Sequence, residues 1–291
     1  MIIAENLTRR GALTGVTIDI APGETLAVVG ESGSGKTALA RLLLRLDRPT
    51  SGGLPADGVH GLFPDLDPRM TIADSVAEPM RVHRRHDPAW RDELLTLVGL
   101  GPGDGRRRPA DLPAPELRRA ALARGLALRP GVLVLDEPVA DLDPSARAEL
   151  TALLRAVRER LGTAYLYLTR DVADVRQLAE RVAVLYRGGI VERGPAQAVF
   201  EAPAHPYTQA LLSAVPVADP RRERRRRRVP LAEERPDAPA GGCRFRHRCP
   251  KFAAELTTLQ RGKCSAEAPA PRPRAGGAEA ACHYASVATV W

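Results

Sequence analysis

The stretch Gly30-Glu31-Ser32-Gly33-Ser34-Gly35-Lys36-Thr37 decides the fold, because it fits the pattern G-x-x-x-x-G-K-[ST] at every position. The apolar run 25–29 precedes it and predicts a buried parallel strand, and an amphipathic helix pattern begins at residues 37–44. Strand, glycine loop and helix in this order form a phosphate-binding loop (P-loop, residues 30–37), in which backbone N–H groups and the helix dipole bind phosphate.

A second acidic element follows the apolar run 132–135, which ends in Asp136 and Glu137. In a nucleotide site built on the P-loop, Lys36 reaches the β- and γ-phosphates and the Thr37 hydroxyl ligates Mg²⁺. We expect Asp136 to support the same ion, and Glu137 to orient or deprotonate an attacking water. The two elements together predict a nucleotide and Mg²⁺ site.

The remaining patterns predict an α/β fold with a mainly parallel sheet covered by helices. A strand is expected at 164–169, a hairpin over 182–192 turning at Gly188-Gly189, and loops in the Gly- and Pro-rich stretch 47–61. Helical patterns cover 71–82, 88–98, 116–128, 144–161 and 171–180. A shift in composition near residue 200 predicts two domains, 1–200 and 201–291.

The composition indicates a soluble protein rather than a membrane-spanning one. The chain has 291 residues, of which 44% are hydrophobic, and no apolar run approaches the roughly 18 residues of a membrane span. The N-terminus has no signal-peptide pattern, so we expect a cytoplasmic chain whose membrane contact comes through a partner. Residues 221–228 hold seven arginines and one glutamate, +6 of the net charge of +8. Such a confined tract is typical of a solvated linker, and it argues against a nucleic-acid partner.

All four cysteines lie near the end of the chain, with the spacing C-x5-C-x14-C-x17-C at Cys243, Cys249, Cys264 and Cys282. Disulfides are rare in a reducing compartment, so the clustering indicates a metal or cluster site. The first spacing is wider than the C-x₂₋₄-C of structural zinc sites, whereas four thiolates suit an iron–sulfur cluster. Zinc and unligated thiols remain open alternatives.

With these motifs the chain resembles the ATP-binding subunits of ABC importers for dipeptides, oligopeptides or nickel. The resemblance covers nearly the whole chain. Its most specific part is the segment Pro203-Ala204-His205-Pro206-Tyr207-Thr208-Gln209-Ala210-Leu211-Leu212, which is followed by the cysteines. Further matches are Asp67-Pro68-Arg69-Met70-Thr71 with Glu78-Pro79, Glu137-Pro138-Val139 with Leu142-Asp143, and residues 181–186.

The resemblance implies a P-loop ABC nucleotide-binding domain with a helical subdomain, plus a small cysteine-containing C-terminal domain. It also implies ATP and Mg²⁺ as ligands and a [4Fe–4S] cluster at the four cysteines. Two such subunits form a head-to-tail dimer at the cytoplasmic face of the plasma membrane. There they drive two permease subunits, to which an extracytoplasmic solute-binding protein delivers the substrate.

Several motifs of that family are eroded here. The signature loop L-S-G-G-Q falls at Leu112-Pro113-Ala114-Pro115-Glu116, where Pro113 has no hydroxyl and Pro115 no N–H. The loop glutamine aligns with Pro64, and the switch histidine with Arg170, which either pairs with Glu137, touches the γ-phosphate or is a solvated surface arginine. No aromatic residue before Phe63 can stack on adenine, which leaves Arg9 or Arg10 as candidates for a cation–π contact.

The pattern therefore predicts ATP binding with slow hydrolysis, in a heteromeric pair whose second ABC ATPase supplies an intact signature loop. The transported solute is a peptide, nickel or another small molecule. The alternative is a non-hydrolysing nucleotide-binding subunit that regulates or scaffolds the same transporter. A soluble P-loop protein acting on nucleic acid is disfavoured by residues 203–212 and by the confinement of the basic tract.

Overall fold

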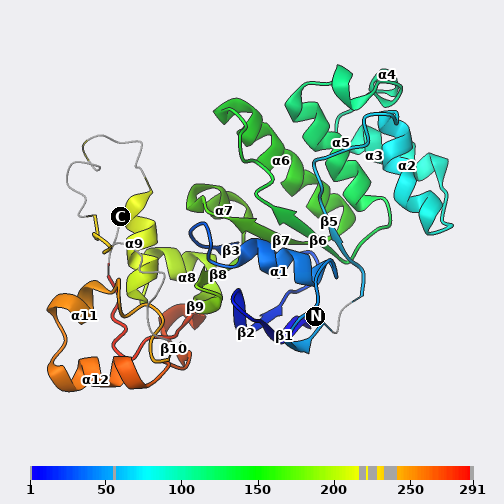
Figure 1. Ribbon diagram of the computed structural model, residues 1–291. Coiled ribbons are helices and arrows are strands. Elements are labelled where there is room, and N and C mark those ends of the chain that lie inside the picture. Colours follow the sequence, from blue (N-terminus) through cyan, green and yellow to red (C-terminus); the bar gives the residue numbers. More distant parts are fainter. Residues whose placement is uncertain (1, 55–56, 216–220, 222–227, 233–240, 289–291) are drawn as a thin grey trace.

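A computed structural model describes residues 2–54, 57–215, 221, 228–232 and 241–288 of the chain. Figure 1 shows a sheet-based core at its centre, a group of helices at one end, and the C-terminal extension (residues 201–291) at the other. The Arg-rich tract that we predict to be a linker spans residues 221–228, and all of it except Arg221 and Arg228 lies outside the described residues.

The core is a sheet in which, within the described residues, eight strands follow the order β10-β11-β9-β8-β3-β7-β6-β5. The strands β8, β3, β7, β6 and β5 are parallel, and β9, β11 and β10 continue the sheet in antiparallel fashion. Their bounds are β3 Thr25–Val29, β5 Val59–Gly61, β6 Val132–Asp136, β7 Ala164–Thr169, β8 Arg181–Tyr186, β9 Gly189–Pro195, β10 Arg272–Pro273 and β11 Glu279–Ala280. The all-apolar runs form the central strands because both faces of such a strand are covered.

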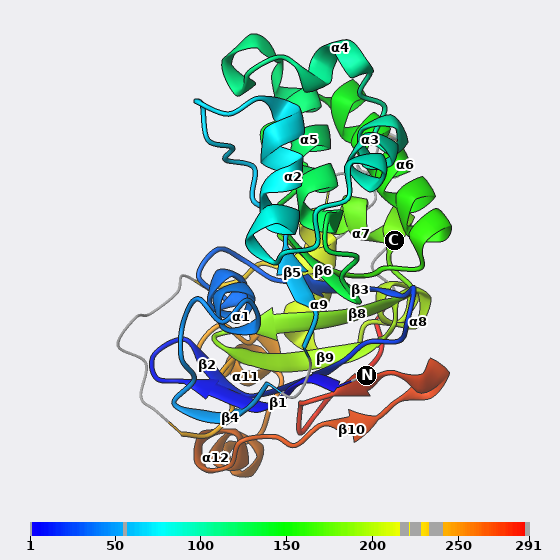
Figure 2. The same cartoon turned by 90° about the vertical axis from the view of Figure 1, so that its right-hand side faces the viewer.

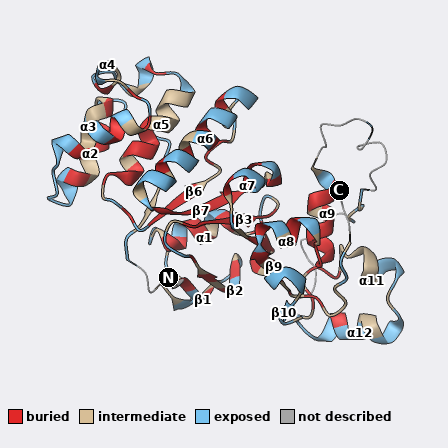
Figure 3. Ribbon diagram, turned by 180° about the vertical axis from the view of Figure 1, so that it is seen from behind, coloured by how far each residue is buried: buried red, intermediate tan, exposed pale blue. Residues whose placement is uncertain are grey.

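The alternation of side chains along the strands separates two cores. On one face of the sheet, Leu26, Val28, Leu166 and Leu168 pack with helix α1 (Lys36–Leu43) and the N-terminal strands. Those strands form a small antiparallel sheet of β1 (Ile2–Arg9), β2 (Leu13–Asp19) and β4 (Ser51–Gly53). On the other face lie the helices α6 Pro144–Leu161, α7 Val172–Leu178, α8 Ala196–Glu201 and α9 Pro206–Ala214. The strands between these layers are buried, as Figure 3 shows.

The helical subdomain stands at the end of the sheet beyond β5 (Figures 1 and 2). Its elements are α2 Ile72–Val82, α3 Pro88–Leu97, α4 Pro102–Gly105, the 3₁₀ turn Pro109–Asp111 and α5 Ala114–Leu126. Side chains begin two of these helices, since the Thr71 hydroxyl accepts from the Asp74 N–H and the Asp87 carboxylate from the Trp90 N–H. The Trp90 indole N–H in turn donates to the Ala127 carbonyl at the end of α5.

The C-terminal extension wraps around the opposite edge of the sheet (Figure 2). It contains α9, α11 (Pro250–Ala254) and α12 (Thr258–Ala266), and the short hairpin of β10 and β11. Strand β11 pairs with β9, with Glu279 opposite Arg193 and Ala280 opposite Glu192. One continuous sheet therefore includes residues of both predicted domains, and the boundary near residue 200 stays a prediction.

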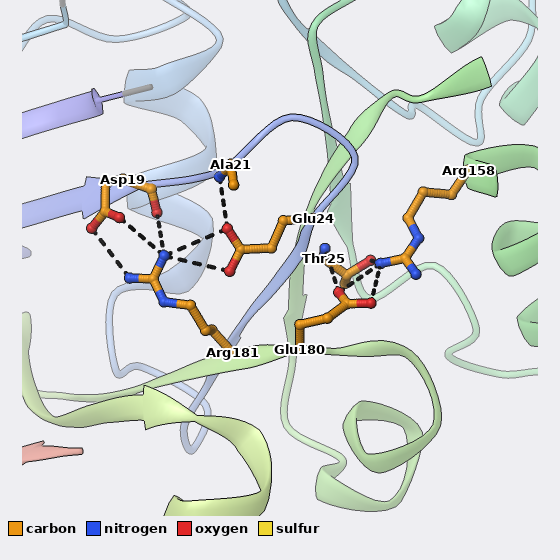
Figure 4. Close-up of polar contacts among 7 residues, drawn as sticks. All are labelled: Asp19, Ala21, Glu24, Thr25, Arg158, Glu180 and Arg181. Atoms are coloured by element: carbon orange, nitrogen blue, oxygen red, sulfur yellow. Dashed lines mark hydrogen bonds and ion pairs between the residues drawn. The ribbon is translucent and has the colours of Figure 1, made fainter. Parts of the chain in front are cut away.

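Hydrogen bonds and ion pairs of two arginines stabilise the end of β3 that is opposite the P-loop (Figure 4). The Arg181 guanidinium donates to the Asp19 carboxylate at 3.0 Å and to the buried Glu24 carboxylate at 3.4 Å. Arg158 donates to Glu180 at 2.6 Å and to the Thr25 hydroxyl at 2.9 Å. Because the Arg181 hydrogen bond stabilises the carboxylate, the pKa of Asp19 lies below its ordinary value.

Most of the predicted elements are confirmed in kind. The strands predicted at 25–29, 132–135 and 164–169 are β3, β6 and β7, and the helices begin and end within a few residues of the predicted positions. Two details are wrong. The hairpin turns at Arg187-Gly188, one residue earlier than predicted, and the stretch 47–61 contains β4 and β5 instead of loops alone. Both short strands are specified by pairing with distant strands and not by their own sequence.

The Arg181 contacts give the first testable prediction. Replacing Arg181 by Ala leaves the buried Glu24 carboxylate without its cation, and we expect a loss of about 1–3 kcal/mol in the free energy of unfolding at pH 7. Urea denaturation measures the change. The control is Arg69→Ala, which breaks an exposed ion pair with Asp67 and should leave the transition unchanged. Equal stability of the Arg181 variant and the wild type would contradict this view of β3.

Candidate nucleotide-binding site

The P-loop connects the buried strand β3 to helix α1, and its glycines are required by close backbone contacts. Gly35 has φ +113°, and a Cβ there would lie 2.9 Å from both the Ala12 carbonyl and a Leu13 methyl group. A Cβ on Gly30 would lie 2.3 Å from the Leu185 carbonyl oxygen. The loop is thus packed between the β1–β2 turn and strand β8, which leaves room for glycine alone at these positions.

Lys36 lies inside the curve of the P-loop. Its ammonium group donates to the carbonyls of Gly30 at 2.7 Å and Glu31 at 3.1 Å, and the residue is buried. Burial lowers the pKa of Lys36, while the carboxylates of Glu137 and Asp136 act in the opposite direction. The position gives a cation at the mouth of the loop, as the motif predicts.

Asp136 ends strand β6 beside the start of α1, where its carboxylate accepts a hydrogen bond from the Thr37 hydroxyl. Burial raises the pKa of Asp136, and the contacts with Thr37 and Lys36 lower it in part. A hydroxyl and a carboxylate in contact are hard oxygen ligands of the kind that Mg²⁺ prefers. The two residues predicted to hold Mg²⁺ are therefore adjacent.

Glu137 follows directly and has φ +48°, an uncommon backbone conformation for a residue other than glycine. Its carboxylate accepts from the Arg170 backbone N–H at 3.1 Å and from the Thr169 hydroxyl at 3.4 Å. The Arg170 side chain is exposed, and no ion pair joins it to Glu137 in the part of the chain that the structure describes. Of the three alternatives for Arg170, a side-chain pair with Glu137 is absent from this structure.

A cavity of about 550 Å³ opens beside Glu137, between residues 139–142, the end of β7 and helix α9. Asp174 lies in its wall, 4% exposed, with Oδ1 3.6 Å from the Arg147 guanidinium and Oδ2 buried without a hydrogen-bond partner. Burial raises the pKa of Asp174 to about 6. Sequence reasoning missed this carboxyl group; its only signal was an acidic residue among the apolar positions of a predicted helix.

The eroded positions lie in the helical subdomain and at its junction with the core. Pro113 precedes α5 without a side-chain cap, and Pro113 and Ala114 are exposed at the helix N-terminus. One carboxylate oxygen of Glu116 is buried there without a hydrogen-bond partner. Pro64 is exposed after β5, beside Phe63, whose exposed fraction is 45%. The fold of this segment is kept although its residues differ from the family pattern.

The two candidates for an adenine contact differ in their surroundings. The Arg9 guanidinium forms an ion pair with Asp47 at 2.7 Å, whereas Arg10 is exposed. The Arg10 side chain is therefore better placed than that of Arg9 to contact an adenine base, and an adenine contact by either residue stays a prediction.

The four cysteines come from separate segments of the C-terminal extension and line one small pocket together with Phe245, Phe252 and Tyr284. Burial raises the pKa of all four thiols, to about 11 for Cys264 and Cys282. Within the described ranges, no group of three or more His, Cys, Asp or Glu side chains is arranged to hold a metal ion. The thiols are thus gathered, but not in the tight tetrahedron of a single zinc ion.

Comparison with known proteins assigns the chain to a family. Residues 13–140 match the ABC transporter family, and residues 191–255 match the "Oligopeptide/dipeptide transporter, C-terminal region". A relative in Sinorhizobium fredii, named "Probable peptide ABC transporter ATP-binding protein", is 38% identical over an alignment of 299 positions, gaps included, that covers 94% of this chain and 82% of that protein. The chain belongs to the ATP-binding subunits of oligopeptide/dipeptide ABC transporters.

Two further similarities agree with this assignment. The glutathione import ATP-binding protein of Escherichia coli is 43% identical over an alignment of 250 positions, gaps included, that covers 77% of this chain and 40% of that protein. A subunit of an ABC transporter complex from Clostridium perfringens has the same fold, with a TM-score of 0.61, 25% identity, and 68% and 90% of the two chains covered. This ABC ATPase family binds ATP with Mg²⁺ and hydrolyses it. No helix in the described part of the chain is both long and apolar enough to span a bilayer.

The buried Asp174 gives a prediction for pH dependence. Its pKa of about 6 in the folded protein exceeds the value of about 3.9 expected in the unfolded chain, so the folded state binds more protons between these values. Stability is therefore lost as the pH rises from about 4 to 6. We expect Asp174→Asn to raise the melting temperature at pH 8 and to have little effect near pH 4. The control Asp92→Asn removes an exposed carboxylate paired with Arg91 and should leave the melting temperature unchanged at both pH values. A less stable Asp174 variant at pH 8 would contradict the assignment.

Proposed function

We propose that this chain energises the import of a peptide, nickel or another small solute, as one half of a heteromeric ATPase pair with weak hydrolysis of its own. The observation that carries the proposal is a contrast. Lys36, Thr37, Asp136 and Glu137 meet at one edge of the sheet, whereas Pro113, the residue before α5, provides no side-chain cap for that helix. The peptide substrate is supported by the S. fredii relative's name.

The need for a different partner follows from the N-terminus of α5. A signature loop binds the γ-phosphate on the opposite subunit through a serine hydroxyl and backbone N–H groups. Here Pro113 and Pro115 supply neither, and Glu116 places a carboxyl group in the same turn, where it repels phosphate. Two copies of this chain would bring this turn to both ATP molecules, so an intact loop must come from a second ABC ATPase.

The permease contact is proposed for a groove between the core and the helical subdomain. Its cavity has a volume of about 270 Å³ and is lined by Leu44 and Leu46, which follow α1, and by residues of β5, α2 and α5. Phe63 and Leu46 line it and are 45% and 52% exposed, which is unusual for large apolar side chains. An apolar helix end of one permease suits this groove, and the transporter contains two permeases. Through them the chain is peripheral at the cytoplasmic face of the membrane, and an extracytoplasmic solute-binding protein acts on the permeases.

A second candidate is a non-hydrolysing regulatory or scaffold subunit of the same transporter. The exposed Arg170 side chain favours it, since a guanidinium cannot accept a hydrogen bond as the family's histidine does. Both candidates keep ATP binding, and they differ in whether the pair turns over ATP at this chain's P-loop.

We therefore predict that the purified chain binds ATP but hydrolyses it at least about tenfold more slowly than its pair with an intact-motif subunit. Glu137→Gln should abolish the part of the paired activity that this P-loop supplies, because the attacking water loses its base. Phosphate release, measured for each chain and for the pair, checks this. Brisk turnover by the chain alone would refute the proposal, and an unchanged rate for the Glu137→Gln pair would favour the scaffold.

A repaired chain provides the matched control. The substitutions Pro113→Ser, Ala114→Gly, Pro115→Gly and Glu116→Gln restore the family's signature sequence without touching the P-loop. If the eroded segment is what limits the isolated chain, the repaired chain dimerises in ATP on the Glu137→Gln background, as size-exclusion chromatography would detect. The unrepaired Glu137→Gln chain should remain monomeric.

We further propose that Cys243, Cys249, Cys264 and Cys282 hold a [4Fe–4S] cluster. The support is a set of four thiols gathered in one apolar pocket, with the guanidinium groups of Arg244 and Arg246 near Cys243 to offset the negative charge of a thiolate-ligated cluster. Such a cluster would cross-link four segments of the extension.

Anaerobic purification tests this proposal. We expect a brown protein with about four irons and four inorganic sulfides per chain, and loss of the colour in Cys264→Ser. Colourless protein with one zinc per chain would favour a zinc site, and metal-free protein with four titratable thiols would show that they are unligated.

A further inference from the structure

The C-terminal extension contacts the P-loop directly, and both contacts converge on Glu31. The Glu31 backbone N–H donates to the Tyr207 hydroxyl at 3.0 Å, across 176 residues of sequence. The Glu31 carboxylate accepts from the Arg248 guanidinium at 2.8 Å, across 217 residues. The Arg248 side chain is 11% exposed and the Glu31 side chain 36%, so the guanidinium is shielded from solvent whereas the carboxylate is partly open to it.

Glu31 transmits these contacts to the phosphate-binding lysine. Its carbonyl accepts from the Lys36 ammonium at 3.1 Å and from the Ser34 N–H at 3.1 Å. The N–H, the side chain and the carbonyl of one residue are thus all engaged. The first two are held by the extension, and the third faces Lys36 and the loop.

Tyr207 is held rigidly. It is fully buried and packs on Tyr186, with 4.6 Å between ring centroids and 49° between ring planes, and it also contacts Phe245. The start of its helix α9 is fixed by Glu192, whose buried carboxylate accepts from the backbone N–H groups of Ala204 and His205. An anion at a helix N-terminus is favoured by the helix dipole. The Tyr207 hydroxyl therefore has a defined place against the P-loop.

Arg248 is held by the turns that carry two of the cysteines. Its backbone N–H donates to the Phe245 carbonyl, its Nε to the Ala232 carbonyl, and its guanidinium lies 5.9 Å from the Tyr186 ring centroid. Cys243 and Cys249 lie on either side of this run of residues. The placement of Arg248 thus depends on how the cysteine-bearing turns are folded.

We propose that Tyr207 and Arg248 are positioning residues of the ATP site, which act through Glu31 to set the affinity for nucleotide. Arg248 neutralises a carboxylate that the P-loop itself carries and that would otherwise repel the ATP phosphates, and Tyr207 fixes the peptide that faces Lys36. This inference rests on ATP binding by the chain, and not on the heteromeric pairing or slow turnover proposed above.

A double-mutant cycle tests the role of Arg248, with ATP and ADP affinities of the full chain measured by isothermal titration calorimetry. Arg248→Gln should weaken ATP binding about tenfold, because it leaves the Glu31 carboxylate unneutralised. Glu31→Gln should bind ATP at least as tightly as the wild type. The double variant should resemble Glu31→Gln, since without the carboxylate there is no charge to offset. Arg248→Lys should restore part of the affinity.

Tyr207→Phe tests the second contact, because it removes one hydroxyl and keeps the aromatic packing. We expect a several-fold loss of affinity for both nucleotides, with a fall of only a few degrees in the melting temperature from the unpaired Glu31 N–H. The matched control is Arg261→Gln, which removes a guanidinium from α12 that donates to the Ala253 carbonyl, away from the P-loop. It should bind ATP as the wild type does, with the same metal content.

Two results would overturn the proposal. Wild-type affinity in both Arg248→Gln and Tyr207→Phe would show that the contacts do not influence the site. An equal loss from Arg248→Gln with and without Glu31→Gln would show that Arg248 does not act through Glu31. Either result leaves the importer function intact, since that is decided by the paired ATPase measurement.

Discussion

The central place of β3 is the constraint on which the rest of the structure depends. This strand lies between β7 and β8 in parallel register, with Val29 opposite both Thr169 and Val184. Strand β6 follows on the far side of β7, with Asp136 opposite Leu168. The carboxyl ends of these strands therefore meet at one edge, where the P-loop, the acidic pair and Arg170 are brought together. Arg158 and Arg181 fix the other end of β3.

The sequence predicts this edge well because each central strand is a short apolar run followed at once by a polar motif. It does not predict the small N-terminal sheet or β5, since these are specified by pairing with distant strands. The positions of Lys36 and Thr37 could be predicted because they are local to the P-loop, and that of Asp136 because it directly follows a central apolar strand. The contacts of Glu31 with Tyr207 and Arg248 could not, since no local pattern connects residues so far apart.

The eroded segment at residues 112–116 illustrates how fold and chemistry separate in one helix turn. Proline is well suited to the first turn of a helix, because the missing N–H has no partner there in any case. The same missing N–H is a loss where a phosphate has to be bound. The stability of the fold therefore tolerates the prolines at the start of α5. They would be unfavourable only for binding the nucleotide of the opposite subunit.

The pairing of β11 with β9 has a consequence for how the molecule can be divided. A chain that ended after α8 would lose the strand that covers β9, together with Tyr207 and Phe245, which pack on Tyr186. The fragment would present an unpaired strand edge next to a bare aromatic surface, a combination that favours association between molecules. The cysteine-bearing region therefore covers the edge of β9 and the aromatic surface beside it. We expect the solubility of the core to depend on this cover.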